Sequence, residues 1–371
     1  MSQASLARPP ASDDVSAIVL DQADRLFQLH VTPQCLAAAD EGRWPEAAWR
    51  AAEEAGLPLA LVPEALGGVG LPAPVAALLT RRSAYFAFPA PLAETMVAAA
   101  LWAQASGETA EGPLSIAPDL DGSPALLRRD GEGVQLAGTL RGVPWAGQAA
   151  AVLVHARDER GAPHLVLVPR DAYRVAVRRN LAREPRDTVS LDGAALPRAA
   201  VRPAPPACAG GLAPFGAAMR AQQMVGAMER CLDHALSYAG ERKQFGRPIG
   251  KFQAVQHMLA DAAGQYAAAA AAADLAASAQ GSAAFPFAAA VAKARTGEAA
   301  GRVAEVCHQV HGAMGFTREH PLHFSTRRLW SWRDEFGGEA LWQDRIGRAV
   351  CEGGGEALWE TLVATRGARA P

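Results

Sequence analysis

Residues 241–253 read ERKQFGRPIGKFQ, and this stretch lies between two long segments with helical periodicity. Upstream of it, apolar residues recur every three or four positions and mark one face of a helix: Met224, Met228, Leu232, Leu236 and Ala239. The Gly-Arg-Pro-Ile-Gly run at 246–250 then breaks the periodicity, and a second helical pattern begins near Lys251. The stretch therefore predicts the turn between two helices of a helical bundle.

The pattern along the rest of the chain divides it into three regions. Residues 12–111 carry helical periodicity. Residues 112–206 carry short Val- and Leu-rich segments between turn residues, at 133–140, 149–155, 164–168 and 173–177, and end in a Pro-rich run at 202–206 that is typical of a linker. Residues 207–371 are helical again, with further helices expected at about 284–311 and 338–366. We therefore expect an α+β protein with a helical N-domain, a central antiparallel β-domain and a C-terminal four-helix bundle.

The overall composition is that of an ordinary globular protein. The chain has 371 residues, of which 50% are hydrophobic and 20% charged, which is enough for two or three domains of roughly 100–200 residues. The formal net charge of -2 gives no general attraction to nucleic acid or to an anionic membrane. An anionic ligand would therefore have to be bound by a local cluster of arginines.

The cysteines and the N-terminal residues indicate the cellular compartment of the protein. The five cysteines are widely spaced and form no C-x-x-C pair, which favours free thiols in a reducing compartment and predicts neither a disulfide framework nor a metal site. The first residues carry no secretory signal pattern, and no apolar run approaches the roughly 20 residues that a membrane span needs. We expect a cytoplasmic protein without a membrane partner.

Two stretches of the C-terminal region carry a family resemblance. The first is the turn quoted above, continuing to Leu259-Ala260-Asp261, and the second is QVHGAMGFT at 309–317, followed by Arg327. Residues 63–71 and 89–95 add weaker N-terminal matches. The two main stretches resemble the R-x-x-F-G-x-x-I-x-x-F-Q…L-A-D and Q-x-x-G-G-x-G-[FY] motifs of the acyl-CoA dehydrogenase family, and the likeness covers about residues 40–350. The chain is identified as a member of that family.

The resemblance implies FAD as the cofactor, lying between the β-domain and the bundle with its adenosine end at a neighbouring subunit. Arg242 matches the family's arginine at the FAD pyrophosphate, and a planar guanidinium suits paired phosphate oxygens. The other matched positions line the cofactor or let the backbone approach it: Gln244, Phe245, Phe252, Gln253, Gln309, Gly312 and Gly315. Without the resemblance, Arg242 would be a basic residue in the last turn of a helix, and Gln309 a polar helix residue.

The implied reaction removes the α-proton of an acyl-CoA thioester while the flavin accepts a hydride from the β-carbon. A buried carboxylate is the expected base, because burial raises its pKa toward neutrality. In the ungapped match the base position is Phe336, and the position that a second branch of the family uses is Gly216. Glu335 is the nearest carboxylate and our candidate catalytic residue. The alternative is that Asp334 and Glu335 cap the following helix.

The β-domain departs from the family pattern as well. The family's T-E-P-x-x-G-S-D stretch is reduced to residues 117–123, and Gly142-Val143-Pro144 stands where the family has W-I-T beside the flavin, with Trp145 one residue further on. The departures therefore affect contacts to the flavin ring more than those to the adenosine end. They resemble subunits of heteromeric dehydrogenases that act on steroid or other bulky acyl-CoA thioesters.

Two functions follow from the sequence. The first is FAD-dependent α,β-dehydrogenation of an acyl-CoA in lipid catabolism, with an electron-transfer acceptor as partner. The second is a non-catalytic subunit of a heteromeric acyl-CoA dehydrogenase, paired with a homologue that carries the base. In either case the Ala-rich bundle is expected to form the core of a homo- or hetero-oligomer.

Overall fold

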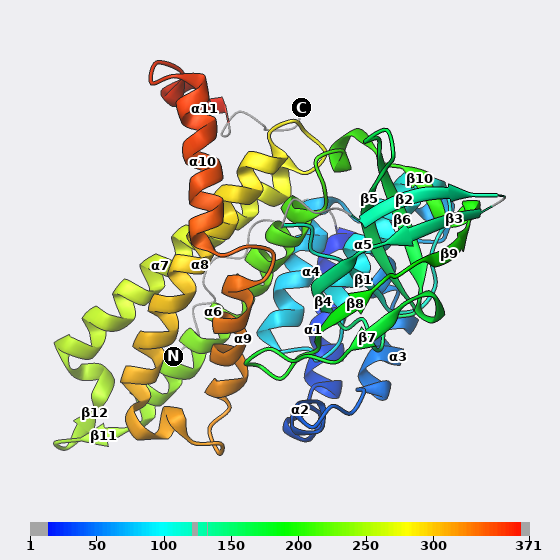
Figure 1. Cartoon of the computed structure of the whole chain (residues 1–371). Coiled ribbons are helices and arrows are strands. Elements are labelled where there is room, and N and C mark those ends of the chain that lie inside the picture. The colour runs from blue at the N-terminus through cyan, green and yellow to red at the C-terminus, as the bar shows by residue number, and fades with distance from the viewer. Residues whose placement is uncertain (1–13, 121–124, 132, 365–371) are drawn as a thin grey trace.

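The computed structural model describes residues 14–120, 125–131 and 133–364, so residues 12–13 and 365–371 of the predicted outer regions lie outside it. Helices come first, strands follow, and long helices complete the described chain (Figure 1). The predicted α+β architecture is confirmed.

The N-terminal helices begin and end at residues suited to those positions. Thr32 caps α2, because its hydroxyl accepts from the backbone N–H of Cys35 at 3.2 Å, and Pro33 takes the first helical position. Gly107, with φ 74°, ends α5 in the left-handed conformation that glycine favours. The helices are α1 (Asp14–His30), α2 (Pro33–Asp40), α3 (Glu46–Glu54), α4 (Ala73–Tyr85) and α5 (Leu92–Ser106).

The β-domain consists of two sheets among the described residues. The larger has the order β10-β6-β5-β2-β3-β9, with β1 also paired to β5, and the smaller has the order β4-β8-β7. The strands are β1 (Leu114–Ile116), β2 (Ala125–Asp130), β3 (Gly133–Ala137), β4 (Thr139–Pro144), β5 (Ala151–Asp158), β6 (Pro163–Pro169), β7 (Arg174–Ala176), β8 (Arg186–Ser190), β9 (Ala194–Pro197) and β10 (Val201–Pro203).

Two details of the β-domain differ from the sequence prediction. Most strand pairs are antiparallel as expected, but β5 pairs in parallel with both β1 and β2. The chain between β2 and β5 passes through β4 in the smaller sheet, and this crossover lets β5 enter the larger sheet in the same direction as β2. The run at 202–206 is only partly a linker. Its first residues belong to β10, an edge strand on β6, and an edge position tolerates Pro203.

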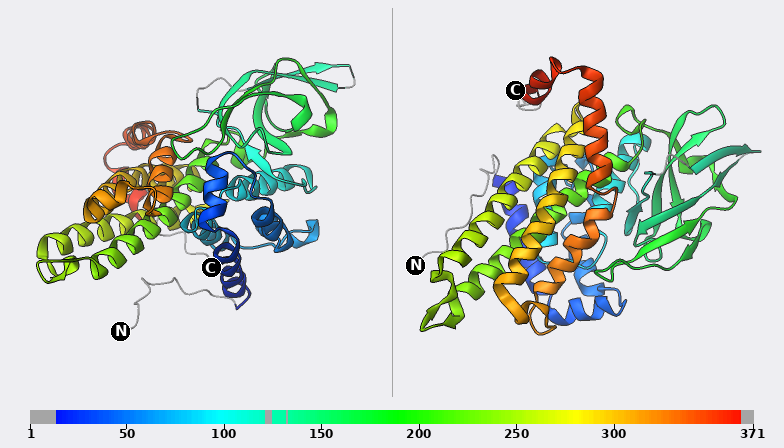
Figure 2. Two further views of the ribbon diagram at one scale, coloured as in Figure 1. Left: turned by 90° about the horizontal axis from the view of Figure 1, so that it is seen from below. Right: turned by 60° about the vertical axis from the view of Figure 1, so that its left-hand side comes forward.

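The C-terminal region, as far as it is described, is a bundle of long helices with a short β-hairpin at its tip. The helices α6 (Ala213–Glu241), α7 (Gln253–Ala279), α8 (Phe285–His311) and α9 (Leu322–Asp334) pack together, and β11 (Lys243–Gln244) and β12 (Arg247–Pro248) form the turn between α6 and α7. Figure 2 shows these helices side by side, with the β-domain standing to one side.

The helix predicted at 338–366 is present but not continuous, and its first part packs on α8. It consists of α10 (Glu339–Gly353) and α11 (Ala357–Ala364), broken at Gly354, whose φ of 78° does not continue a helix. These two helices extend from the end of the bundle (Figure 1), and α9 takes the fourth bundle position. α9 is absent from the sequence prediction because its arginines and tryptophans give a weak apolar stripe.

One hydrophobic core runs through the N-terminal helices and the bundle, and the β-domain has a second core of its own. The helical parts therefore form one body against which the β-domain packs. None of the helices in the described ranges has the length and apolar character to cross a membrane.

Candidate cofactor and active site

A pocket of about 320 Å³ lies at the tip of the bundle, where α6 and α8 end. The two motif stretches meet there: Arg242 and Gln244 from the α6–α7 turn face Gln309 and Gly312 at the end of α8, and all four line the pocket. Four residues singled out from two distant stretches of sequence therefore come together in space.

The chemistry of this pocket fits a dinucleotide phosphate. Arg242 ends α6 and is exposed, and within the described residues its guanidinium has neither an ion pair nor a hydrogen bond. A free guanidinium is suited to paired phosphate oxygens. Gly312 has φ 59° and ψ -138°, a conformation that is essentially restricted to glycine, and it leaves the backbone exposed beside the pocket. The residues present therefore fit the FAD that the resemblance implies.

The other matched residues lie near the pocket without lining it. Phe245 is 91% exposed at the turn and makes an edge-to-face contact with Phe252, with ring centroids 6.1 Å apart. Gln253 is exposed at the start of α7. Gly315 is buried, and a side chain there would press on His311 and His308, so its smallness serves packing between α8 and the following turn.

His311 is a pocket residue that the sequence analysis did not single out. Its ring stacks on Tyr238 at 4.7 Å, and its Nδ1 lies 2.6 Å from the carbonyl oxygen of Cys307. Nδ1 therefore donates, while Nε2 is buried with no hydrogen-bond partner among the described residues. Burial lowers the pKa of His311, which favours the neutral ring. Nothing in the sequence distinguishes His311 from any other polar residue at the end of a helix.

The two possible base positions of the sequence analysis are in direct contact. Phe336 is 2% exposed, and its ring lies on Gly216 so closely that any side chain on Gly216 would collide with it. The guanidinium of Arg220, one helical turn after Gly216, lies 5.5 Å from the same ring. An aromatic ring thus fills the space where the family match expects a carboxylate.

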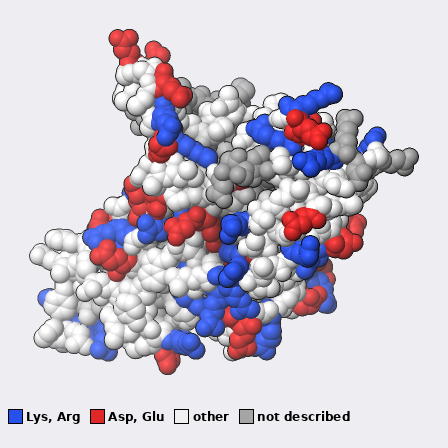
Figure 3. Space-filling view, in the orientation of Figure 1, with Lys and Arg blue, Asp and Glu red and all other residues white. Residues whose placement is uncertain are grey.

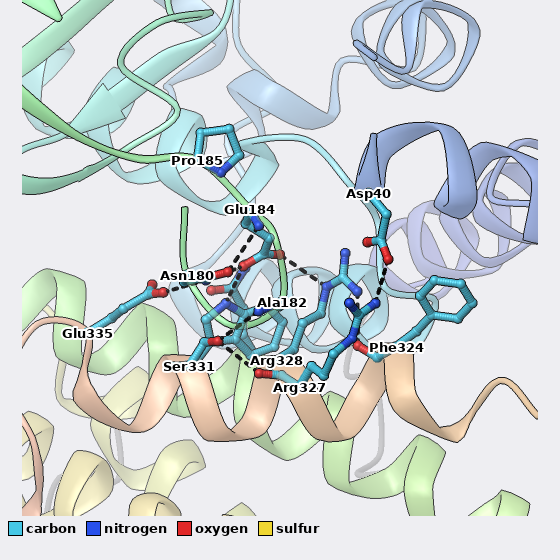
Figure 4. A network of polar contacts seen from close by, with 12 residues as sticks. Asp40, Asn180, Ala182, Glu184, Pro185, Phe324, Arg327, Arg328, Ser331 and Glu335 are labelled. Atoms are coloured by element: carbon cyan, nitrogen blue, oxygen red, sulfur yellow. Dashed lines mark hydrogen bonds and ion pairs between the residues drawn. The ribbon is translucent and has the colours of Figure 1, made fainter. Parts of the chain in front are cut away.

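Glu335 lies beside this ring with both carboxylate oxygens occupied. Oε2 accepts a hydrogen bond from Arg220 Nε at 2.7 Å, and Oε1 forms an ion pair with Arg186 Nε at 2.7 Å. The side-chain amide of Asn180 donates to Oε1 at 2.9 Å (Figure 4). Glu335 is the residue after the end of α9, and α10 starts from Gly338 without a side-chain cap. The helix-capping alternative is therefore wrong for Glu335, while its role as a base stays a prediction.

Glu335 belongs to a buried ion cluster that joins all three domains. We call this set the six-residue cluster: Glu94 from α5, Glu184 and Arg186 from the β-domain, Arg220 from α6, and Arg328 and Glu335 from the α9 region. Three arginines face three glutamates, so the cluster is neutral. Burial favours the protonated form of Glu184, but the charges of Arg186 and Arg328 outweigh it and lower the pKa of Glu184 to about 2.

The other side of the turn is held through its backbone. The indole N–H of Trp342 donates to the carbonyl oxygens of Phe336 and Gly337 at 3.0 and 3.2 Å. Lys293 Nζ, fully buried, donates to the carbonyl oxygens of Arg333 and Gly337 at 2.5 and 2.7 Å. Burial lowers the pKa of Lys293 to about 8. Residues 335–337 are therefore fixed from both sides.

The β-domain departures have visible structural consequences. Trp145 has φ 55° and packs edge-on against Trp44 at 6.2 Å, so it contacts the N-terminal domain. Asp119 accepts from the backbone N–H of Leu212 at 2.6 Å and so binds the start of α6. Residues 121–123 of the reduced motif lie outside the described residues. Figure 3 shows Lys and Arg side chains gathered between α9 and the adjoining β-domain.

Comparison with known proteins agrees with this architecture. The model of the acyl-CoA dehydrogenase N-terminal domain matches residues 14–111, and that of the acyl-CoA dehydrogenase C-terminal domain matches residues 212–344. The three-domain fold is that of a family whose members are flavoproteins. The chain belongs to the acyl-CoA dehydrogenase family.

Individual relatives give the extent of the likeness. The chain is 41% identical over 118 residues to acyl-CoA dehydrogenase IpdE2 of Mycobacterium tuberculosis, an alignment that covers 32% of this chain and 36% of that protein. It is 28% identical to acyl-CoA dehydrogenase FadE27 of the same organism, over 92% of this chain and 97% of the relative. A solved variant of the Tcur3481–Tcur3483 steroid ACAD has a TM-score of 0.82 and 29% identity, covering 92% of this chain and 98% of its own.

Proposed function

We propose that the chain is a subunit of a FAD-dependent acyl-CoA dehydrogenase that removes hydrogen from the α- and β-carbons of an acyl-CoA thioester. The observation that carries the proposal is the pocket at the bundle tip, where Arg242, Gln244, Gln309 and Gly312 converge. Arg242 would hold the pyrophosphate of FAD, and Gly312 would let the backbone approach it. When bound, the flavin supplies the acceptor for the hydride from the β-carbon.

The pocket supports an oligomer as the working form. It opens to solvent at the end of the bundle remote from the chain's own β-domain (Figures 1 and 2), so a second chain would have to complete the site around the flavin ring. Exposed apolar side chains flank it, with Phe245 at 91%, Phe316 at 74% and Met314 at 44% exposure. Such a surface is typical of a subunit interface. The partner would be a second copy or a homologous chain.

The proposal includes the substrate, the acceptor and the location. An acyl-CoA thioester and an electron-transfer acceptor follow from the family membership. Lipid catabolism in the cytoplasm is proposed on the same ground, together with the widely spaced cysteines, all five of which are free thiols. The similarity to a steroid ACAD supports a bulky acyl group.

A second candidate function is a subunit without its own base. The observation that favours it is Phe336 on Gly216, which leaves no carboxylate at either base position. Glu335, the remaining candidate base, accepts hydrogen bonds from Arg220 and Asn180, one at each oxygen, and forms an ion pair with Arg186. In this case the chain would contribute its half of the cofactor pocket to a homologue that carries the glutamate.

The absorbance spectrum of the purified full-length chain, titrated with FAD and then with acyl-CoA under anaerobic conditions, tests both candidates. A yellow protein bleached by acyl-CoA without any partner supports the first. Bleaching only after mixing with a homologue that carries the glutamate supports the second. A chain that binds no FAD, with or without that homologue, contradicts both. Light scattering on the same samples shows whether the oligomer is a homo- or hetero-oligomer.

A further inference from the structure

We propose that Glu335 is a positioning residue, whose carboxylate fixes the turn at Phe336 and thereby keeps the phenyl ring on Gly216. The phenyl ring then occupies the space of the missing base because specific contacts hold it there, and not merely because the glutamate has been replaced. The inference goes beyond the proposed function, because it concerns the protein without cofactor or substrate.

The backbone of the turn is strained and needs support. Phe336 has φ 54°, in the left-handed region that a bulky residue rarely adopts, and Gly337 follows with φ 93°. Such a conformation persists only where the surroundings determine it from several sides. A side chain on Gly337 would press on Leu341 and Trp342, so the second residue of the turn has to be glycine.

Glu335 is the support on one side of the turn. Its carboxylate contacts Arg220 at 2.7 Å, Arg186 at 2.7 Å and Asn180 at 2.9 Å, so donors from the bundle and the β-domain hold the residue directly before Phe336. Trp342 and Lys293 hold the carbonyl groups that follow. The backbone of the turn cannot move away from Gly216 without breaking one of these two sets of contacts.

The other two glutamates of the six-residue cluster lie outside this turn. Glu94 pairs with Arg220 at 2.8 Å from α5, and Glu184 pairs with Arg186 and Arg328 from the β-domain. If charge balance were the whole role of Glu335, removing its charge and removing that of Glu94 would have the same effect on the turn. If Glu335 positions the turn, only its own replacement moves Phe336.

Trp342 provides a reporter of the turn, because its indole N–H bonds to the carbonyl oxygens of Phe336 and Gly337. We would label the eight tryptophans of the full chain with fluorotryptophan, assign Trp342 with Trp342→Phe, and record fluorine NMR spectra without FAD. In Glu335→Gln the amide nitrogen has to face a donor of Arg186, Arg220 or Asn180, so the turn loses an anchor.

The expected result is a shift of the Trp342 resonance in Glu335→Gln that is at least severalfold larger than in Glu94→Gln. The unfolding midpoint should fall by about 4–6 °C in both variants, because each leaves a buried arginine without one partner. Asp344→Asn, which breaks an exposed ion pair on α10 close to Trp342, is the matched control and should leave both readouts unchanged.

If Glu335→Gln does not fold, the same measurement is made on the double variant Glu335→Gln with Arg186→Gln. This variant removes one charge of each sign and so leaves the cluster neutral. It should recover part of the lost stability and still shift the Trp342 resonance. Equal shifts in Glu335→Gln and Glu94→Gln, or no shift in any Glu335 variant, overturn the proposal. Because no flavin is present, none of these outcomes bears on the proposed dehydrogenation.

Discussion

Replacing Phe336 by glutamate puts a carboxylate where the family match expects the base. The side chain would start from the turn that now presses a ring onto Gly216, and it would lie near Arg220, whose guanidinium is 5.5 Å from that ring. If the chain binds FAD and acyl-CoA but lacks only a base, Phe336→Glu should allow it to reduce its flavin. General-base catalysis contributes about 100- to 10,000-fold in rate, which sets the size of the expected gain.

The stability cost of this change can be worked from the contacts. Phe336 is 2% exposed, and truncating a buried phenylalanine to alanine costs about 3–5 kcal/mol. Glutamate fills part of the volume of the phenylalanine side chain, and its carboxylate would lie near Arg220 in a cluster that is otherwise neutral. We therefore expect a net loss of about 2–4 kcal/mol in the free energy of unfolding. A protein of this size can retain its fold with such a loss if it starts within the usual range of about 5–15 kcal/mol.

The assay is anaerobic stopped-flow measurement of flavin bleaching after mixing with acyl-CoA. Phe336→Gln is the control, because it has the size and polarity of glutamate without its basicity. Equal rates of flavin reduction in Phe336→Glu and Phe336→Gln, both shown to bind FAD, would exclude position 336 as the place of a working base. Bleaching of the wild-type protein at a rate that Glu335→Gln abolishes would instead establish Glu335 as the base.

Three further predictions concern the cofactor, the turn and pH. Arg242→Ala should weaken FAD binding roughly 10- to 150-fold, because it loses a phosphate contact of about 1.5–3 kcal/mol. FAD titration of the apo-protein measures the affinity, with Arg348→Ala as control, and an affinity equal to that of the wild type would show that Arg242 does not bind FAD. Gly216→Ala should lower the free energy of unfolding by about 1–3 kcal/mol, because the added methyl group collides with Phe336. In a double-mutant cycle this loss should be smaller when Phe336→Ala is also present, and an equal loss in both backgrounds would contradict the contact. Burial, with the charges of Arg230 and neighbouring histidines, lowers the pKa of His234 to about 3. The contribution of neutral His234 to the free energy of unfolding is therefore complete above pH 6.5. It is lost as the pH falls from there toward 3, by at most about 1.4 kcal/mol per pH unit. Urea unfolding from pH 7.5 to 5 should show a flatter pH dependence in His234→Gln, and parallel curves would exclude this contribution.

The candidate cofactor pocket and the turn at Phe336 differ in how far the sequence predicts them. Arg242 and Gln309 lie in short stretches whose residues act through local backbone geometry: a helix end, a glycine turn, a left-handed glycine. Such geometry is encoded by neighbours in the chain, so the motifs identify the residues. That the two stretches face one pocket, with His311 between them, depends on how α6 and α8 pack, and the motifs carry no information on this.

The order of the domains, the family and the missing carboxylate at Phe336 follow from the sequence alone, because periodicity and motif spacing are local properties of the chain. Three features emerge from the folded chain and not from its motifs: α9 packs on α6 and α8, Phe336 lies on Gly216, and Glu335 is held by Arg186 and Arg220. Those contacts join residues far apart in the chain and in different domains. A buried charge is stable only with partners in place, and which partners reach Glu335 is fixed by the packing of all three domains.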